Sequence, residues 1–217
     1  MQTNKEMVDW LRENREDAPS KIFDAMEIVN RMDFLPEFVK SEAYSPWDAL
    51  PIGYGQTCSA PEVVAFMCKH LGLEKGQKVL EVGSGCGYHA SVVAEIIDPG
   101  KVISLDIVPE LVNMARENIS RTKKKLGRNW DIEVVYADGS GGYEKEKPYD
   151  RIYFTAGVPG NYSLDVLSDQ LVEGGRCILA PSMGAFRLGV KKEGKIKSGY
   201  VGDFFAFVPL RGRYGFE

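Results

Sequence analysis

A strand-like run that ends in three alternating glycines is the feature that most constrains the fold of this chain. Val79-Leu-Glu-Val-Gly-Ser-Gly-Cys-Gly-Tyr88 passes from apolar residues into the glycines, and a helical pattern follows over residues 88–97. Glycines let a turn bend tightly and let a ligand approach the backbone without meeting a Cβ atom. The helix behind the turn offers free N–H groups and the positive end of its dipole. The pattern predicts a strand–turn–helix unit that binds a ligand.

Strand and helix patterns alternate along the chain after residue 58. We expect helices at residues 61–71, 88–97, 109–121 and 164–171, and strands at 78–82, 102–106, 132–136, 151–155 and 176–180. Candidate antiparallel strands follow at 186–192 and 200–208. This alternation predicts an α/β fold with a doubly wound, mostly parallel, Rossmann-like sheet and a C-terminal antiparallel strand pair. Ligands bind such sheets at the carboxyl ends of the strands.

The first part of the chain has a different pattern. Two short amphipathic helices are expected at residues 6–12 and 21–29. Residues 33–57 are interrupted by proline and glycine and are expected to be irregular. Irregular segments of this length are commonly lids or substrate loops. We expect one domain over residues 1–217, with the N-terminal helices and a substrate loop in 1–58 and the cofactor-binding core and tail in 59–217.

Composition excludes several classes of function. No run approaches the roughly 18 apolar residues of a membrane span, and the first residues lack the apolar core of a signal peptide, so we expect a cytoplasmic protein without a membrane partner. A net charge of −4 argues against nucleic-acid binding, and the basic run 121–128 is typical of a solvated helix end. With only His70 and His89 as imidazoles and no C-x-x-C pair, no metal site is predicted.

The spacing of the glycines indicates the type of cofactor. The pattern G-x-G-x-G differs from the dinucleotide fingerprint G-x-G-x-x-G, which disfavours a nicotinamide-dependent oxidoreductase and favours S-adenosylmethionine. The expected contacts from the turn are Gly83, Ser84, Gly85 and Gly87. Glu81 lies two residues before the first glycine. It either accepts a hydrogen bond from the cofactor's ammonium group or orients the turn.

Two more acids follow the next two predicted strands. Asp106 lies 19 residues beyond Gly87, where a carboxylate can accept both ribose hydroxyls of an adenosine. Its alternative role is to cap the helix that begins near Pro109. Asp138-Gly139 follows the third strand, where the acid accepts the adenine amino group or forms an Asp-Gly turn.

At several motifs the sequence resembles the protein-L-isoaspartate O-methyltransferase family, over nearly the whole chain. The most discriminating motif is Leu50-Pro-Ile-Gly-Tyr-Gly-Gln-Thr-Cys-Ser-Ala-Pro61, and the others lie at residues 79–88, 106–111, 115–118, 138–143, 148–152, 174–176 and 207–210. The resemblance implies an enzyme that uses S-adenosylmethionine to methylate the α-carboxylate of L-isoaspartyl residues in damaged proteins and peptides. The resulting ester collapses to a succinimide, which allows repair. The resemblance also implies a monomer that needs no metal.

The resemblance further implies roles for individual residues. Gln56 and Thr57 would form the wall between cofactor and acceptor, and Ile107 would contact the cofactor beside Asp106. The residues expected to bind the acceptor are Ile52, Gly53, Ser59, Thr155, Ala156, Val208 and Leu210. The Ser59 hydroxyl would orient the acceptor carboxylate as the catalytic residue. The local sequence also fits a capping box, with Ser59 as the N-cap and Glu62 at the third helical position.

Four departures from the family pattern cluster around the expected peptide groove: Glu62, Asn30, the longer segment 44–51 and the absence of a glutamine near residues 185–187. They keep two alternatives open, a methyltransferase with another acceptor and a non-catalytic peptide adaptor that binds S-adenosylmethionine. Carboxylate methylation itself suits a chain with few histidines, because carboxyl groups are ionised at pH 7 and no general base is needed.

Overall fold

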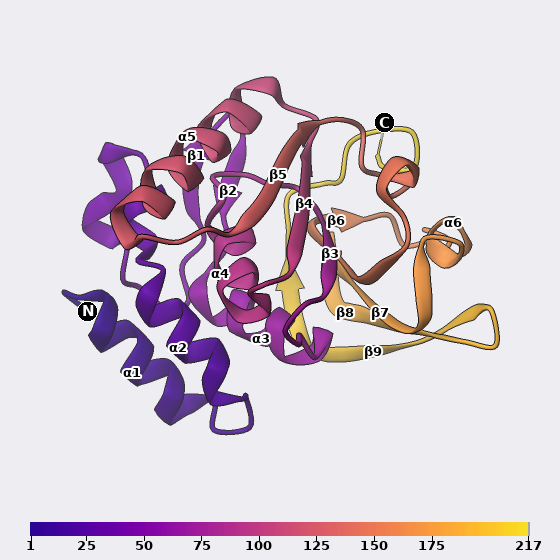
Figure 1. Ribbon diagram of the computed structural model, residues 1–217, viewed down its shortest axis with the longest axis horizontal. Helices are drawn as coiled ribbons and strands as arrows, with labels where there is room; N and C mark the ends of the chain where they lie inside the picture. The colour runs from indigo at the N-terminus through magenta and orange to yellow at the C-terminus, as the bar shows by residue number, and fades with distance from the viewer. Residues whose placement is uncertain (217) are drawn as a thin grey trace.

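The computed structural model describes residues 1–216 and is built around a seven-stranded sheet (Figure 1). Its strand order is β5-β4-β3-β6-β7-β8-β9. The first five of these run parallel, and β8 and β9 are antiparallel additions at one edge. The bounds are β3 (Lys78–Val82), β4 (Lys101–Asp106), β5 (Asp131–Tyr136), β6 (Tyr149–Val158), β7 (Leu171–Pro181), β8 (Met183–Lys192) and β9 (Lys195–Ala206). The predicted doubly wound sheet with a C-terminal antiparallel pair is confirmed.

Helices cover both faces of the sheet. Successive residues of a strand point to opposite faces, so the central strands bury side chains on both. Val79 belongs to one buried cluster, together with side chains from the first five helices, and Leu80 belongs to a second cluster that includes Leu167. Burial on both faces explains why the central strands read as continuous apolar runs. The helices beside the sheet are α3 (Pro61–Leu71), α4 (Tyr88–Ile97), α5 (Pro109–Leu126) and α6 (Asp165–Ser168).

The winding direction of the sheet changes between β3 and β6. The chain runs from β3 through α4 to β4 on one side, whereas β6 and β7 are added on the other side. The connections after β3 and after β6 therefore run in opposite directions, and in such sheets a crevice forms outside the carboxyl ends of the two strands. The glycine turn follows Val82 at this position.

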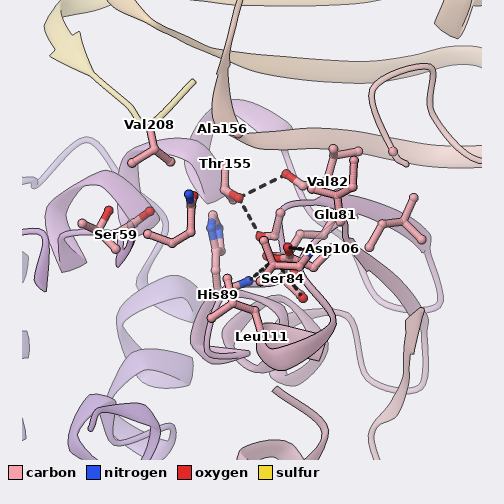
Figure 2. Close-up of a pocket in the computed structure, with 18 of the residues that line it drawn as sticks. Ser59, Glu81, Val82, Ser84, His89, Asp106, Leu111, Thr155, Ala156 and Val208 are labelled. Carbon is pink, nitrogen blue, oxygen red and sulfur yellow. Dashed lines mark hydrogen bonds between the residues drawn. The ribbon is translucent and has the colours of Figure 1, made fainter. Parts of the chain in front are cut away.

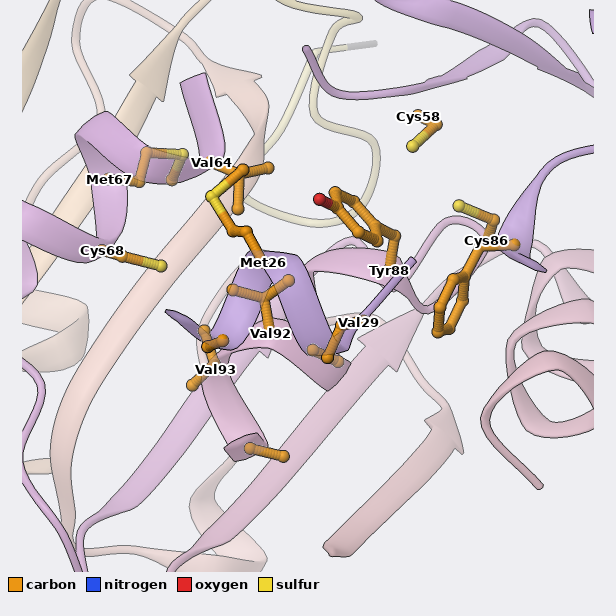
Figure 3. Packing of buried hydrophobic residues seen from close by; sticks show 14 of the residues in the cluster. Met26, Val29, Cys58, Val64, Met67, Cys68, Cys86, Tyr88, Val92 and Val93 are labelled. Carbon is orange, nitrogen blue, oxygen red and sulfur yellow. The ribbon is translucent and has the colours of Figure 1, made fainter. Parts of the chain in front are cut away.

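The N-terminal helices α1 (Asn4–Asn14) and α2 (Ser20–Ile28) pack against the helical layer on one face of the sheet. Figure 3 shows Met26 of α2 beside Val64 of α3 and Val92 of α4, and all three are fully buried. This packing anchors the start of the segment between α2 and α3.

The expectation that residues 33–57 are irregular was wrong. The segment contains the second half of η1 (Arg31–Phe34), then η2 (Glu37–Glu42) and nearly all of the antiparallel hairpin of β1 (Leu50–Gly53) and β2 (Gln56–Cys58). Gly53, Tyr54 and Gly55 adopt positive φ in the hairpin turn. Proline and glycine mark turns in a sequence, but they do not reveal the short regular segments that lie between closely spaced turns.

The helix predicted over residues 164–171 was also too long. The structure forms only α6, and Leu171 opens β7. The backbone N–H of Tyr149 donates to the carbonyl of Gln170 over 2.8 Å. The Gln170 side-chain amide donates to the carbonyls of Val166 (3.0 Å) and Gly141 (2.7 Å). The backbone pairing with Tyr149 of β6 and the side-chain bond to Gly141 end the helix at this point. Tyr149 and Gly141 are both distant from Gln170 in sequence, so the local pattern does not predict where the helix ends.

The basic run 121–128 spans the last turn of α5 and the residues that follow it. Two of its cations pair with acids, Lys125 with Asp33 (2.7 Å) and Arg128 with Glu95 (2.9 Å). In residues 1–216, no helix is both long enough and apolar enough to cross a membrane.

Candidate active site

The turn after β3 depends on glycine and on a contact from β6. Gly83, Gly85 and Gly87 all adopt positive φ. The Thr155 hydroxyl donates to the carbonyl oxygens of Gly83 (2.6 Å) and Val82 (3.1 Å), as Figure 2 shows. A Cβ atom at Gly83 would collide with that hydroxyl oxygen, so both the backbone angle and the packing require glycine. The turn therefore exposes bare backbone at the cavity beside it.

Asp106 ends β4 and binds the glycine turn. One carboxylate oxygen accepts from the backbone N–H of Gly85 (3.0 Å) and the hydroxyl of Ser84 (3.4 Å), and the other accepts from the N–H of Val108 (3.0 Å). Burial raises the pKa of Asp106, although these hydrogen bonds oppose the rise. Asp106 does not cap α5, whose N-cap is Val108 without a side-chain bond. It both holds the turn and lines the cavity.

Glu81 is fully buried in β3, and its partners are two hydroxyl groups. The Tyr153 hydroxyl donates to one oxygen over 2.8 Å, and the Ser104 hydroxyl donates to the other. Burial is the largest influence on this carboxyl and raises its pKa to about 8. Glu81 lines the cavity but makes no hydrogen bond to the turn amides within residues 1–216, so the turn-orienting interpretation does not describe its contacts.

A single cavity beside the glycine turn collects most of the residues predicted for the site. Its wall includes fourteen of them, from both the cofactor and the acceptor sets. They are Gln56, Thr57, Ser59, Glu81, Gly83, Ser84, Gly85, Asp106, Ile107, Gly139, Thr155, Ala156, Val208 and Leu210. Segments that are far apart in the sequence therefore meet at the predicted end of the sheet.

Four predicted residues lie outside that wall: Gly87, Ile52, Gly53 and Asp138. Gly87 is the N-cap of α4, and buried Ile52 packs behind the turn, where its Cδ1 would lie 3.4 Å from a Cβ at Gly85. Gly53 forms the hairpin turn. The Asp138 carboxylate accepts from the backbone N–H of Ser140 (2.9 Å) and Arg213 (2.8 Å), which supports its role in a turn.

Ser59 is not the N-cap of α3, contrary to the capping-box interpretation. Pro61 is the first helical residue, so the N-cap is Ala60, and no side chain caps this helix. Glu62 pairs with Arg15 of the N-terminal region instead of closing a capping box. Within residues 1–216, Ser59 contributes only its carbonyl oxygen to hydrogen bonds. Its hydroxyl is therefore available to a ligand in the cavity whose wall it shares.

A buried arginine fixes the backbone that carries Ser59. Arg31 is fully buried, and its guanidinium donates to five backbone carbonyls. They belong to Ala43 (3.1 Å), Ser45 (3.3 Å), Asp48 (2.8 Å), Cys58 (3.4 Å) and Ser59 (3.1 Å). The two terminal nitrogens of the planar guanidinium make all five bonds, whereas the buried Nε has no partner within residues 1–216, and the group ties the end of η2, the hairpin and the start of α3 together.

The C-terminal tail forms part of the cavity wall. The N–H of Gly157, in β6, donates to the carbonyl of Val208 (2.8 Å), and the N–H of Leu210 donates back to the carbonyl of Gly157 (2.8 Å). This pairing places Val208 and Leu210 beside Thr155 and Ala156, which lie just before Gly157 in β6.

Several residues in the wall were not predicted, and they include Cys58, Cys86, Tyr88, His89, Leu111 and Arg211. The sequence did contain a signal for His89, because it lies next to Tyr88 in the first turn of the helix that follows the predicted ligand-binding turn. For Arg211, nothing local in the sequence indicates that the tail returns to the sheet.

The residues present fit S-adenosylmethionine. The glycines of the turn leave space that side chains would otherwise occupy. Glu81 and Asp106 line the same cavity, and acidic groups suit a ligand that carries an ammonium and a sulfonium. Within residues 1–216, no group of three His, Cys, Asp or Glu could hold a metal ion. The arrangement can therefore align a donor along the turn with an acceptor beside Ser59.

Comparisons with known proteins agree with this geometry. The profile of the family described as "Protein-L-isoaspartate(D-aspartate) O-methyltransferase (PCMT)" matches residues 1–214. Protein-L-isoaspartate O-methyltransferase 2 of Archaeoglobus fulgidus is 47% identical over 204 residues, which cover 91% of this chain and 88% of that protein. The Methanopyrus kandleri protein-L-isoaspartate O-methyltransferase is 43% identical over 215 residues, covering 96% and 88% of the two chains.

Solved structures show the same likeness. A protein-L-isoaspartate O-methyltransferase superimposes with a TM-score of 0.85 at 26% identity, covering 98% of this chain and 67% of that one. A Plasmodium falciparum structure, described as this methyltransferase in complex with S-adenosyl-L-homocysteine, has a TM-score of 0.82 at 25% identity and covers 97% and 99%.

Proposed function

The chain belongs to the protein-L-isoaspartate(D-aspartate) O-methyltransferase family, and we propose that its cavity places S-adenosylmethionine along the glycine turn and an L-isoaspartyl carboxylate beside Ser59. The activity is S-adenosylmethionine-dependent methylation of L-isoaspartyl residues, which serves protein repair. The observation that carries the proposed placement is the Ser59 hydroxyl, which makes no hydrogen bond within the described chain and lines the same cavity as Gly83 and Gly85.

The cofactor supplies an electrophilic methyl group on a positively charged sulfur. A carboxylate oxygen bonds to this methyl carbon as the carbon–sulfur bond breaks, which yields a methyl ester and a neutral thioether. The carboxylate is already ionised at neutral pH, so the protein has no proton to remove. Its residues need only align the reacting atoms and strip part of the water from the carboxylate. The free hydroxyl of Ser59 suits the first task, and the apolar tail residues Val208 and Leu210 suit the second.

For the cofactor we propose contacts along β2, the glycine turn and the ends of β3, β4 and β5. The residues are Gln56, Thr57, Glu81, Gly83, Ser84, Gly85, Gly87, Asp106, Ile107, Asp138 and Gly139. Asp106 would accept the ribose hydroxyls while it keeps its bond to the Gly85 amide. For the peptide we propose Ile52, Gly53, Thr155, Ala156, Val208 and Leu210 beside Ser59. Ile52, Gly53 and Gly87 would act by holding the hairpin and the turn in place.

We propose in addition that the chain works as a single-domain cytoplasmic monomer that does not bind nucleic acid. The net charge of −4 supports the last point. Sedimentation in the presence and absence of S-adenosyl-L-homocysteine tests the oligomeric state.

A pair of peptides tests the proposed function. The protein is incubated with methyl-labelled S-adenosylmethionine and with peptides that differ only in L-isoaspartate or L-aspartate at one position. Base-labile label in the isoaspartyl peptide alone supports the proposal. Label in another acceptor indicates a methyltransferase of different specificity, and cofactor binding without transfer indicates an adaptor.

A further inference from the structure

His89 lies in the first turn of α4 and lines the cavity, although the chemistry described above gives it no role. Its side chain is 6% exposed, and Nδ1 is buried without a hydrogen-bond partner in residues 1–216. Figure 2 places its imidazole in the space between Ser59 and Thr155. When a buried nitrogen lacks a partner and its side chain lines a ligand cavity, a bound ligand is the natural source of that partner.

The other contacts of the ring hold its orientation and are compatible with a proton on Nδ1. The ring packs on Tyr153 with centroids 4.6 Å apart, and Nε2 lies 3.6 Å from the Sγ atom of Cys68. Burial raises the pKa of Cys68, so this group stays a thiol and can donate its proton to Nε2. When the thiol donates to Nε2, the proton of the neutral imidazole resides on Nδ1, and this is the tautomer that we assign. Burial also lowers the pKa of His89 to about 3, so the ring is neutral at pH 7.

A neutral donor suits the reaction better than a cation at this position. Methyl transfer removes the negative charge of the carboxylate, so a cation beside it would stabilise the ionised reactant more than the transition state. A neutral N–H orients the oxygen and opposes the loss of charge less than a cation would. A buried N–H that has no acceptor costs free energy, and a carboxylate in the cavity would recover that cost.

We propose that the Nδ1–H of His89 donates a hydrogen bond to the α-carboxylate of the isoaspartyl acceptor, at the oxygen that is not methylated. His89 then acts with Ser59 to select and align this carboxylate. The inference rests on the proposed function, because it assigns a second contact to the acceptor.

Two amide substitutions separate the two ring nitrogens. In His89→Asn, the amide lies near the position of Nδ1 and can donate in its place. In His89→Gln, the amide lies near the position of Nε2, so it keeps the side that faces Cys68 and loses the proposed donor. We expect His89→Gln to raise the KM for an isoaspartyl peptide about 10- to 100-fold. His89→Asn should bring the KM back to within about fivefold of the wild-type value. The Kd of S-adenosyl-L-homocysteine should change less than about twofold in both.

A nuclear magnetic resonance experiment tests the contact without turnover. The chain contains only two histidines, so ¹⁵N-histidine labelling gives two imidazoles, and the signal that His89→Asn lacks belongs to His89. With S-adenosyl-L-homocysteine present, adding the isoaspartyl peptide should shift the Nδ1–H signal. The matching aspartyl peptide should leave it in place.

Several results would overturn the inference. One is an unchanged Nδ1–H signal with the isoaspartyl peptide, and another is an unchanged peptide KM in His89→Gln. A rise in the Kd of S-adenosyl-L-homocysteine equal to the rise in KM would instead assign His89 to the cofactor's own carboxylate. If the KM rises equally in both variants and the rise parallels a fall in their melting temperatures, His89 has a purely structural role. Failure of the proposed function itself differs from all of these, because the wild-type protein would then not methylate the isoaspartyl peptide.

Discussion

The guanidinium of Arg31 donates a hydrogen bond of 3.1 Å to the backbone carbonyl of Ser59, at the entrance to α3. The same guanidinium also binds the carbonyl of Cys58, and three of its other bonds reach the segment between η2 and the hairpin. One buried cation therefore sets the position of the residue that we assign to the acceptor. This link makes the site depend on a residue that lies outside the cavity wall.

Arg31→Lys should therefore destabilise the protein and weaken peptide binding. A lysine ammonium has three donors and no planar fork, so at least two of the five carbonyls would lose their partner. We expect the free energy of unfolding in urea to fall by about 2–4 kcal/mol. The peptide KM should rise more than the Kd of S-adenosyl-L-homocysteine. Arg12→Lys, in a half-exposed ion pair with Asp24, is the control and should change stability by less than about 0.5 kcal/mol.

Ser59→Ala should reduce activity without a measurable loss of stability. The hydroxyl neither caps α3 nor bonds elsewhere in residues 1–216, so the roughly 1 kcal/mol cost of removing an N-cap should not appear in urea unfolding. The kcat/KM for the isoaspartyl peptide should fall about 10- to 100-fold. Exposed Ser41, replaced by alanine, is the matched control. A loss of 1 kcal/mol or more with full turnover would restore the capping interpretation.

Gly83→Ala should be far more damaging than an alanine at a comparable open glycine. Both Gly83 and Gly127 have positive φ, but only Gly83 would bring its Cβ against the Thr155 hydroxyl. We expect Gly127→Ala to cost about 1 kcal/mol in unfolding free energy and Gly83→Ala about 3 kcal/mol or more, with weaker S-adenosyl-L-homocysteine binding. Adding Thr155→Ala to Gly83→Ala should recover part of that loss. Equal effects at the two glycines would show that packing at the turn is unimportant.

Glu81 should make the cofactor-free protein less stable as the pH rises from 6.5 to 8. Its pKa is about 8 when folded and 4.5 ordinarily, so the stability contributed by the neutral carboxyl is complete below pH 4.5 and is lost as the pH rises through 8. The pKa of His89, about 3 instead of 6.5, acts in the opposite direction but only below pH 6.5.

Between pH 6.5 and 8, Glu81 should therefore lower the unfolding free energy by up to about 1.4 kcal/mol per pH unit. The lowered pKa of Cys58, about 6 instead of 9.0, acts in the opposite direction in this range, so the contribution of Glu81 is the difference between the wild-type protein and Glu81→Gln. Urea unfolding of both proteins at several pH values measures this difference, because an amide does not titrate. The same slope in both proteins would mean that Glu81 is ionised throughout this range.

The sequence predicts the parts of the site that are local. The strand, the three glycines and the helix after them follow one another, and each has its own strong pattern, so the turn and its place in the sheet were predicted correctly. The motif around Ser59 also predicted part of the cavity wall, although Pro61 moves the start of α3 beyond the predicted cap.

Nonlocal contacts account for what the sequence does not predict. Arg31 meets the carbonyls of five residues that lie 12 to 28 positions later in the chain, and Gln170 ends α6 through partners that include Gly141. Asp138 binds the backbone of Arg213, a residue 75 positions away. The free nitrogen of His89 is defined by a missing partner, and a sequence does not show which groups lack partners.

The central claim is that one cavity joins the methyl donor at the glycine turn to an isoaspartyl carboxylate at Ser59. The most direct measurement is the kcat/KM for paired L-isoaspartyl and L-aspartyl peptides, in the wild-type protein and in Ser59→Ala, with S-adenosyl-L-homocysteine affinity measured alongside. We predict methylation of the isoaspartyl peptide alone, and in Ser59→Ala a loss of activity with cofactor affinity unchanged. Equal methylation of both peptides, or full activity in Ser59→Ala, would contradict the claim.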